Sequence, residues 1–405
     1  MKALGILMAN IASSFYNQVW QNLISHFKRM CGNRRMRRGN LALFSAFKRT
    51  SMARANHDSS NYEFLDNSAW KAASYVRNKI IEWVCDFPLD KDFVARFTSH
   101  EDKEHAGAFF ELVTFQFLRH LGYRVFFQLP SIAGSSRRPD FTVYRKRKEI
   151  LIAECTLSGL PNHSPGIDRL ENQIKDMIES VASPDYYINV DFERSGTISI
   201  AKNKIISFVK KVIAEGQTPV DSLHDVNHWT MEESGWKITV SLIPKPKEST
   251  RTLGINSSGG AEIIDSVSSL RNSLNRKRAS KYGSLSLPYL ICLNSFDFYM
   301  DEMDIMQALF YEDGFWKCNE KPQNRTVSAL LLFKDLGRWN LNSARPILWH
   351  NPWAEYPLTT SILNVDQYIF TDTDRQFPTR KLINGRSFRE ILNIDNDYLS
   401  QEVSN

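Results

Sequence analysis

Apolar side chains return every three or four residues through 62–98, which predicts helical structure there. The positions that carry this period are Trp70, Val76, Ile80, Ile81 and Val84. A second helix is predicted over residues 103–120, ending at Gly122, because glycine adopts the left-handed conformation that closes many helices. This second segment is so densely apolar that we expect it to be buried over most of its circumference. Its apolar residues are Phe109, Phe110, Leu112, Val113, Phe115, Phe117, Leu118 and Leu121.

Beyond Gly122 the pattern changes to short runs typical of strands. Strands are predicted at 123–129, 140–145 and 150–157, with a loop rich in Gly and Ser at 130–138. Farther along, helices are predicted near 168–182, 202–214, 261–281 and 301–310, and strands near 186–192, 236–244, 287–293 and 326–333. The order of helix, three strands, helix and strand, followed by further α/β units, predicts one mixed sheet flanked by helices.

The charge of the chain is unevenly distributed. The 405 residues carry a formal net charge of +6, and 42% of them are hydrophobic, as in a folded globular protein. Residues 1–57 contain ten Lys or Arg and no acidic residue, which leaves 41 of the 51 basic residues against all 45 acidic ones, a net charge of −4. Attraction for phosphates must therefore be local. Residues 1–57 are either a basic arm or targeting segment, or a leader ahead of a later start at Met52.

Cysteine spacing and hydropathy exclude several classes of protein. The five cysteines show no spacing suited to zinc, and we expect Cys85, Cys155 and Cys292 to be core residues. A reducing cytoplasm fits this usage. No stretch reaches the roughly 18–20 apolar residues that span a bilayer, so we expect no membrane partner. Nucleophile-elbow and zinc-protease motifs are absent from the sequence.

Two acidic residues lie at the open end of a predicted β-hairpin. The runs 140–145 and 150–157 flank a charged turn centred on Arg147, and a hairpin symmetric about this residue pairs positions whose numbers sum to 294. Asp140 then lies opposite Glu154, with Cβ atoms about 5 Å apart on one face. Phe141, Val143, Leu151 and Ala153 face the other way.

Such a carboxylate pair calls for a cation. Two acids this close repel one another unless a positive charge lies between them, and Mg²⁺ or Mn²⁺ is well suited to one or two carboxylates plus water. Glu154 follows four apolar residues, where an unpaired charge is costly. The alternative is a solvated hairpin end with Asp140 and Glu154 paired to neighbouring cations. Glu111 is a third candidate, because it is the one acid in the apolar run 106–118; alternatively it lies on a narrow exposed stripe.

At these residues the chain resembles the PD-(D/E)xK nuclease superfamily, which has the restriction-endonuclease-like fold. The resemblance covers about residues 103–192: a helix with Glu111, then Pro139-Asp140, then Glu154-Cys155-Thr156, in the order αβββαβ. The chain also resembles an uncharacterised bacterial family built on this core. That second resemblance is carried by Glu104-His105-Ala106 through Glu111-Leu112, by Arg138-Pro139-Asp140-Phe141 and by Ala153-Glu154. Later stretches extend it: Lys281-Tyr282-Gly283 with Pro288-Tyr289, and His350-Asn351-Pro352-Trp353.

The first resemblance implies a metal-dependent nuclease. Asp140, Glu154 and the backbone carbonyl of Cys155 would bind Mg²⁺, which stabilises charge on a phosphodiester and activates water, and Glu111 would orient metal-bound water. Thr156 occupies the position where the family usually has lysine. A cation from elsewhere would have to replace it, and the candidates are Lys175, Arg278 and Lys281. Otherwise the chain is a nuclease fold without catalysis.

A basic cluster surrounds the predicted hairpin: Arg137, Arg138, Arg145, Lys146, Arg147 and Lys148. It could hold a nucleic-acid backbone beside the site, or simply decorate the turn.

These observations predict an α/β protein in four parts. We expect an arm or leader (1–57), a helical lead-in (58–102), the nuclease-like core (103–192) and an α/β extension packed on it (193–405). The predicted function is Mg²⁺-dependent cleavage of DNA, in restriction, repair or defence by analogy of fold. The alternative is an inactive relative that binds nucleic acid or a protein partner. Assembly as a homodimer is left open.

Overall fold

The structure is a computed structural model that describes residues 42–127, 138–159, 165–216, 228–245, 251–254, 265–278, 282, 285–375 and 378–399. Residues 1–41 of the predicted arm, most of the predicted loop 130–138, and the candidate Lys281 lie outside the described residues. Within those residues, no helix combines the length and the hydropathy needed to cross a bilayer.

The helical lead-in consists of three short helices rather than one continuous helix. They are α2 (Asn61–Asn67), α3 (Lys71–Val84) and α4 (Lys91–Phe97). Each break has a local cause. Ser60 and Glu63 form a capping box at the start of α2, and Asp90 accepts a hydrogen bond from the backbone N–H of Phe93 at the start of α4. Cys85 caps the C-terminus of α3 and is exposed, so its predicted place in the core was wrong.

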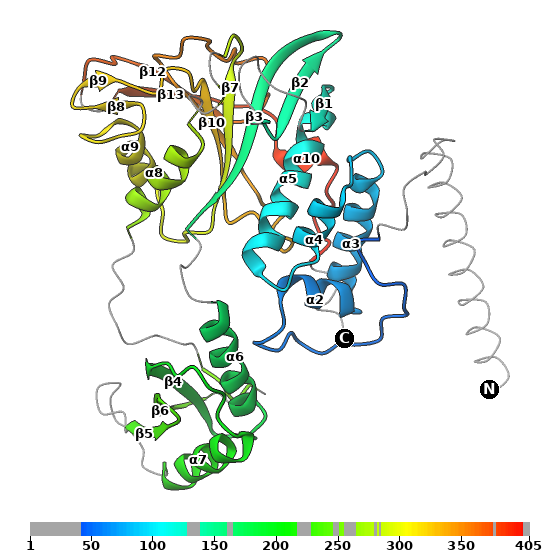
Figure 1. The fold of residues 1–405 in the computed structure, drawn as a ribbon, viewed down its shortest axis with the longest axis vertical. Coiled ribbons are helices and arrows are strands. Elements are labelled where there is room, and N and C mark those ends of the chain that lie inside the picture. Colours follow the sequence, from blue (N-terminus) through cyan, green and yellow to red (C-terminus); the bar gives the residue numbers. More distant parts are fainter. Residues whose placement is uncertain are drawn as a thin grey trace, which may run out of the picture.

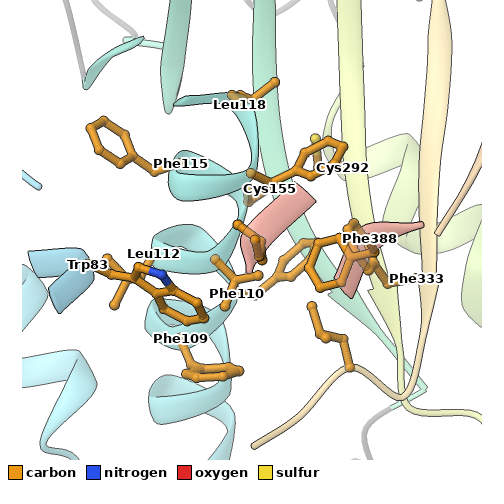
Figure 2. Close-up of a cluster of buried hydrophobic side chains, with 14 of the residues drawn as sticks. Trp83, Phe109, Phe110, Leu112, Phe115, Leu118, Cys155, Cys292, Phe333 and Phe388 are labelled. Carbon is orange, nitrogen blue, oxygen red and sulfur yellow. The ribbon is translucent and has the colours of Figure 1, made fainter. Parts of the chain in front are cut away.

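Helix α5 (Asp102–His120) is the central helix of the fold. Residues on most of its circumference are buried, as the density of apolar residues predicted, and Gly122 has the predicted positive φ, +90°. Figure 2 shows α5 packed between Trp83 on one side and sheet residues on the other. Phe110 contacts Phe333 of the sheet edge-on, with ring centroids 5.4 Å apart. This packing fixes α5 against one face of the main sheet.

The main sheet has eight strands in the order β1-β2-β3-β7-β10-β11-β12-β13. They are β1 (Arg124–Phe127), β2 (Phe141–Arg145), β3 (Lys148–Ser158), β7 (Tyr289–Ser295), β10 (Ala329–Lys334), β11 (Ile347–His350), β12 (Gln367–Thr371) and β13 (Thr379–Ile383). Strands β1, β2 and β3 are antiparallel, whereas β3, β7 and β10 are parallel. The predicted mixed sheet flanked by helices is therefore confirmed (Figure 1).

The prediction of a single sheet was wrong. Strand β4 (Tyr186–Arg194) belongs to a second sheet with β6 (Trp236–Pro244) and β5 (His228–Glu233). Helices α6 (Pro165–Glu179) and α7 (Lys202–Glu215) pack on it, around a separate core that includes Ile188 and Trp236. A short third ladder joins β8 (Lys317–Cys318) to β9 (Lys321–Pro322). Periodicity predicted β4 and β6 correctly, but it carries no information about which strands pair.

In the sequence, the second sheet comes between β3 and the next helix that packs on the main sheet. That helix is α8 (Ser266–Arg276), and β7 follows it. In chain order the main sheet and its helices give α5, β1, β2, β3, α8 and β7, whereas the prediction assigned the last two places to the helix and strand at 168–192, which are α6 and β4 of the second sheet. This order extends over residues 102–295 rather than 103–192, and α6 with β4 does not complete it.

The side chains of each strand point alternately to the two faces of the main sheet. Ala153 and Cys155 of β3 lie in the same core as α5 and α10 (Phe388–Leu392). Ile152 lies in the opposite core, with Leu270 of α8 and Ile305 of α9 (Glu302–Phe310). Because side chains alternate in a strand, Glu154 is on the α8 face. This places a carboxylate under the C-terminal end of α8.

Candidate active site

The hairpin of β2 and β3 has the predicted register next to the two acids. Phe141 pairs with Ala153, and Val143 pairs with Leu151. A β-bulge after Val143 shifts the pairing by one residue toward the turn. Pro139 cannot donate a ladder hydrogen bond, and the strand begins only at Phe141. Asp140 therefore lies just outside β2, at the level of Glu154.

Asp140 and Glu154 are in direct contact. The backbone N–H of Asp140 donates to Glu154 Oε1 at 3.1 Å, and the backbone N–H of Cys155 donates to Asp140 Oδ2 at 2.8 Å. Glu154 is almost fully buried, with 1% of its side chain exposed, whereas 19% of the Asp140 side chain is exposed. The carboxylates thus meet across adjacent strands, as the hairpin pattern predicted, with one of them opening toward solvent.

A lysine lies between the two carboxylates. Lys277 Nζ is 2.6 Å from Glu154 Oε2 and 3.5 Å from Asp140 Oδ2. An ammonium group from α8 therefore pairs with both acids, as the alternative of acids paired with a cation of the chain expected, and the predicted metal ion stays a prediction. When all three groups are ionised, the cluster of Asp140, Glu154 and Lys277 carries a net charge of −1.

Strand β7 fixes the backbone of this lysine. Lys277 is the C-cap of α8, and its N–H donates to the carbonyl of Leu274 at 3.0 Å. The hydroxyl of Tyr289, the first residue of β7, donates to the Lys277 carbonyl at 2.8 Å. Leu270 and Leu274 bury the preceding turns of α8. The ammonium group is therefore held by the packing of α8 on the sheet as well as by its ion pairs.

Tyr282 closes the buried side of the cluster. Its hydroxyl donates to Glu154 Oε1, and only 7% of the residue is exposed. Glu154 thus receives hydrogen bonds from the Asp140 backbone, from Lys277 and from Tyr282, which satisfies a carboxylate that water does not reach.

Burial and charge perturb both ionisable groups of the closest pair. Burial raises the pKa of Glu154 to about 7, the neighbouring Asp140 charge adds to the increase, and Lys277 and Tyr282 oppose it. The pKa of Lys277 is raised well above its ordinary value, because Asp140 and Glu154 together outweigh the effect of burial. Lys277 is therefore a permanent cation at neutral pH, whereas the pKa of Glu154 lies close to neutral pH.

Glu111 lies within electrostatic range of this cluster, but another residue binds it directly. Arg96 of α4 forms two parallel hydrogen bonds to its carboxylate, at 2.8 and 2.9 Å. Burial raises the pKa of Glu111, the Arg96 hydrogen bonds oppose this, and Asp140 adds to the increase. The alternative of a solvated surface acid is wrong, since only 14% of the Glu111 side chain is exposed.

Thr156 follows Glu154 on the same face of β3 and pairs in register with Leu293 of β7. The structure places none of the described substitute cations at the carboxylates. Arg278 donates to Asn275, and Lys175 donates to Asn172 at 3.4 Å. Lys277 was missed, although one signal was available: it lies seven residues after Leu270 and three after Leu274, so it continues the buried stripe of α8.

The residues present fit a divalent cation bound mainly by oxygen. Among the described residues no group of three or more His, Cys, Asp or Glu gathers at metal-binding distance. However, Mg²⁺ is commonly held by only one or two carboxylates, with water and substrate phosphates completing its shell. The Cys155 N–H points to Asp140, and in an extended strand the carbonyl of the same residue points to the same side. The Cys155 carbonyl is therefore directed toward the Asp140 side of β3.

Comparisons of the chain with protein-family models, with curated proteins and with solved structures found no match.

Proposed function

We propose that this protein is a metal-dependent phosphodiesterase that cleaves DNA, with Asp140, Glu154 and Lys277 as its reacting groups. One observation carries the proposal: the Lys277 ammonium lies 2.6 Å from Glu154 and 3.5 Å from Asp140. The resemblance to PD-(D/E)xK nucleases lacks a lysine at Thr156, and Lys277 supplies an ammonium at the same two carboxylates from a different element.

The order of elements supports the same proposal. Helix α5, strands β1 to β3, helix α8 and strand β7 follow one another as in the family, once the second sheet is regarded as an insertion. Asp140 lies immediately before β2 and Glu154 lies in β3, an arrangement that fits the resemblance. The two motifs and the topology are separate observations.

The charges of the residues divide the chemical roles. Hydrolysis forms a bond from water oxygen to phosphorus, breaks a phosphorus–ester oxygen bond and transfers a proton from the water to the leaving oxygen. Lys277 keeps its proton at neutral pH, so it stabilises the negative charge that develops on the phosphoryl oxygens. Glu154 is buried and holds Lys277 in place, so the proton of the attacking water is accepted by Asp140, the carboxylate that reaches solvent. Asp140 is the more exposed carboxylate and faces the substrate side.

Asp140, Glu154 and the Cys155 carbonyl would hold Mg²⁺ or Mn²⁺. When bound, such an ion neutralises phosphoryl charge and lowers the pKa of coordinated water. The net charge of −1 on the cluster favours a further cation. Glu111 is a positioning residue in this proposal, because Arg96 occupies both of its oxygens.

The test is cleavage of plasmid and single-stranded DNA with Mg²⁺ or Mn²⁺. We expect Asp140→Ala and Lys277→Met to lower the rate by about 10²–10³-fold. The matched control is Arg278→Met, which removes the neighbouring cation, whose guanidinium donates to Asn275 rather than to the carboxylates, and it should cleave normally. Absence of cleavage by the unaltered protein, or equal cleavage by Asp140→Ala, refutes the enzyme.

A second candidate is a nuclease fold that binds nucleic acid or a protein partner without cleaving. The observation that favours it is closure of the site, since Glu154 is 1% exposed and Tyr282 covers it. A hollow of about 460 Å³ lies elsewhere, between α9 and the ends of β10 and β11, and is lined by Trp349 and Lys334 among others. DNA binding without cleavage under every metal condition is the result expected for this candidate.

A further inference from the structure

The turn of the β2–β3 hairpin carries four consecutive cations. Arg145, Lys146, Arg147 and Lys148 are all exposed. Among the residues that the structure describes, none of the four forms an ion pair or a side-chain hydrogen bond. Glu149, the nearest acid, accepts a hydrogen bond from the hydroxyl of Tyr144 instead. Lys237 of β6, by contrast, lies 2.5 Å from Glu193.

The backbone conformation of the turn is unfavourable for a lysine at position 146. Lys146 has φ +60°, in the left-handed region that glycine and asparagine adopt more readily in two-residue hairpin turns. A lysine at this position breaks the local preference of the turn. Residues that break a local rule without a structural compensation are typical of functional sites.

The same two strands carry the turn and the carboxylates. Arg145 pairs with Lys148 beside the turn, and Phe141 pairs with Ala153 beside the acids. Seven residues separate Arg147 from Glu154, which is about 23 Å at the rise of a strand. Six to seven base-pair steps of duplex, at about 3.4 Å each, span the same length. In Figure 1 the β2–β3 hairpin ends at the top of the main sheet, and residues 145–148 of its turn are exposed.

We propose that this basic turn, residues 145–148, contacts the phosphates of duplex DNA about two thirds of a helical turn from the cleaved bond. The inference rests on the proposed function and names its substrate as a duplex. Four cations that no described residue neutralises complement the regular phosphate charges of a duplex, and a two-stranded ribbon has the width of a major groove.

The composition of the turn argues against other occupants. A protein interface has an apolar or aromatic centre, and a membrane-binding segment inserts apolar side chains. The exposed large hydrophobic residues of the described chain include Phe298, Tyr299 and Met303, and none lies in 145–148. Charge is therefore the feature that this turn offers to a partner.

The experiment measures binding separately from cleavage. A fluorescent 30-base-pair duplex is titrated with the full chain in EDTA, at several salt concentrations, by anisotropy. The test variant is Lys146→Gly with Arg147→Gln. Loss of two phosphate contacts should reduce the slope of log K against log salt by about 2. Because glycine suits the left-handed φ of Lys146, the variant should melt no lower than the unaltered protein, so weaker binding is not attributable to unfolding.

A matched control removes two exposed cations elsewhere. Lys202→Gln with Lys210→Gln alters α7 and should leave the salt slope unchanged. An unchanged slope in the turn variant, an equal change in the α7 control, or no duplex binding by the unaltered protein overturns the inference. If the protein cleaves DNA but the turn variant has an unchanged salt slope, the proposed function is supported and the contact of the turn with DNA is refuted. A slope that depends on the turn, without cleavage, supports the contact and refutes the enzyme.

Discussion

Replacing Lys277 by methionine tests the central ion pair without emptying its space. Methionine fills most of the volume of the lysine stem but carries no charge. In the unaltered protein the ammonium lies 2.6 Å from the buried Glu154 carboxylate. The variant leaves that carboxylate with its hydrogen bonds from Tyr282 and the Asp140 backbone, beside the Asp140 charge and without a cation. We expect a loss of stability that depends on pH.

The direction of this dependence follows from the pKa of Glu154. Its folded value of about 7 lies above its ordinary 4.5, so the folded state binds more protons than the unfolded state between these values. Stability is therefore highest below about pH 4.5 and is lost as the pH rises toward 7. A pKa difference of about 2.5 corresponds to a change of about 3 kcal/mol. Without Lys277 the folded pKa rises further, so the loss continues to higher pH.

The free energy of unfolding that Lys277→Met removes therefore differs between pH 9 and pH 5. At pH 9 Glu154 is ionised in the unaltered protein, and removing the partner of a buried charge costs about 3 kcal/mol, at the low end of the usual range because 27% of the Lys277 side chain is exposed. At pH 5 Glu154 is protonated in both proteins. What remains is the 3.5 Å contact with the partly exposed Asp140, which contributes about 1 kcal/mol or less.

Urea unfolding at pH 5, 7 and 9, followed by tryptophan fluorescence, measures the difference. Glu154→Gln is combined with Lys277→Met in a double-mutant cycle, because the amide that this substitution introduces has no charge for the lysine to neutralise. Arg278→Met serves as the surface control. A destabilisation by Lys277→Met that is equal at pH 5 and pH 9, or a coupling energy near zero at pH 9, refutes the reasoning.

Three further predictions concern other parts of the same core. Arg96→Met leaves the partly buried Glu111 carboxylate without its bidentate partner and should cost about 2–3 kcal/mol at pH 8, and less as the pH is lowered, because burial raises the pKa of Glu111; urea midpoints check this against Asp92→Asn, which leaves that pair intact. Gly159→Ala should cost about 2–4 kcal/mol, because Gly159 has φ +73° and a Cβ would lie 2.6 Å from the Asp297 nitrogen. At Gly122, with φ +90°, an added Cβ would meet no atom within 4 Å, so Gly122→Ala should cost only about 1 kcal/mol. Equal shifts of the thermal midpoint in Gly159→Ala and Gly122→Ala would contradict the steric argument. In the native state iodoacetamide should alkylate the exposed Cys85 and spare Cys155, whose burial raises the thiol pKa; mass spectrometry of the peptides decides, and early modification of Cys155 would show that the strand is accessible.

The sequence was sufficient for the hairpin because its information is local. Alternating apolar residues and a charged turn specify which residues of a two-stranded ribbon face each other. Phe141 therefore meets Ala153 as predicted, and Asp140 reaches Glu154. The bulge after Val143 was not predicted, but it lies on the turn side of the acids and leaves their register intact.

The partition into two sheets could not be predicted in this way. Strands β4 and β6 were predicted as strands, and so were β7 and β10 of the main sheet, whose residues are buried almost without interruption. Their pairing is decided by which surfaces are buried together, and Trp236 with Ile188 forms a core of its own. Parallel pairing of β3 with β7 joins residues more than 130 positions apart, which no local pattern specifies.

The position of the lysine follows from that long-range pairing. A lysine two residues after Glu154 would lie on β3 itself. Lys277 instead lies at the C-terminal end of α8, and it reaches the carboxylates only once α8 has packed on the sheet. The Tyr289 hydroxyl ties the Lys277 carbonyl to β7, and the pairing of Ile291 with Glu154 ties β7 to β3. The charge geometry is therefore set by a closed path of packed elements. Lys277 therefore reaches the two carboxylates because the end of α8 is anchored to β7, the strand that pairs with β3.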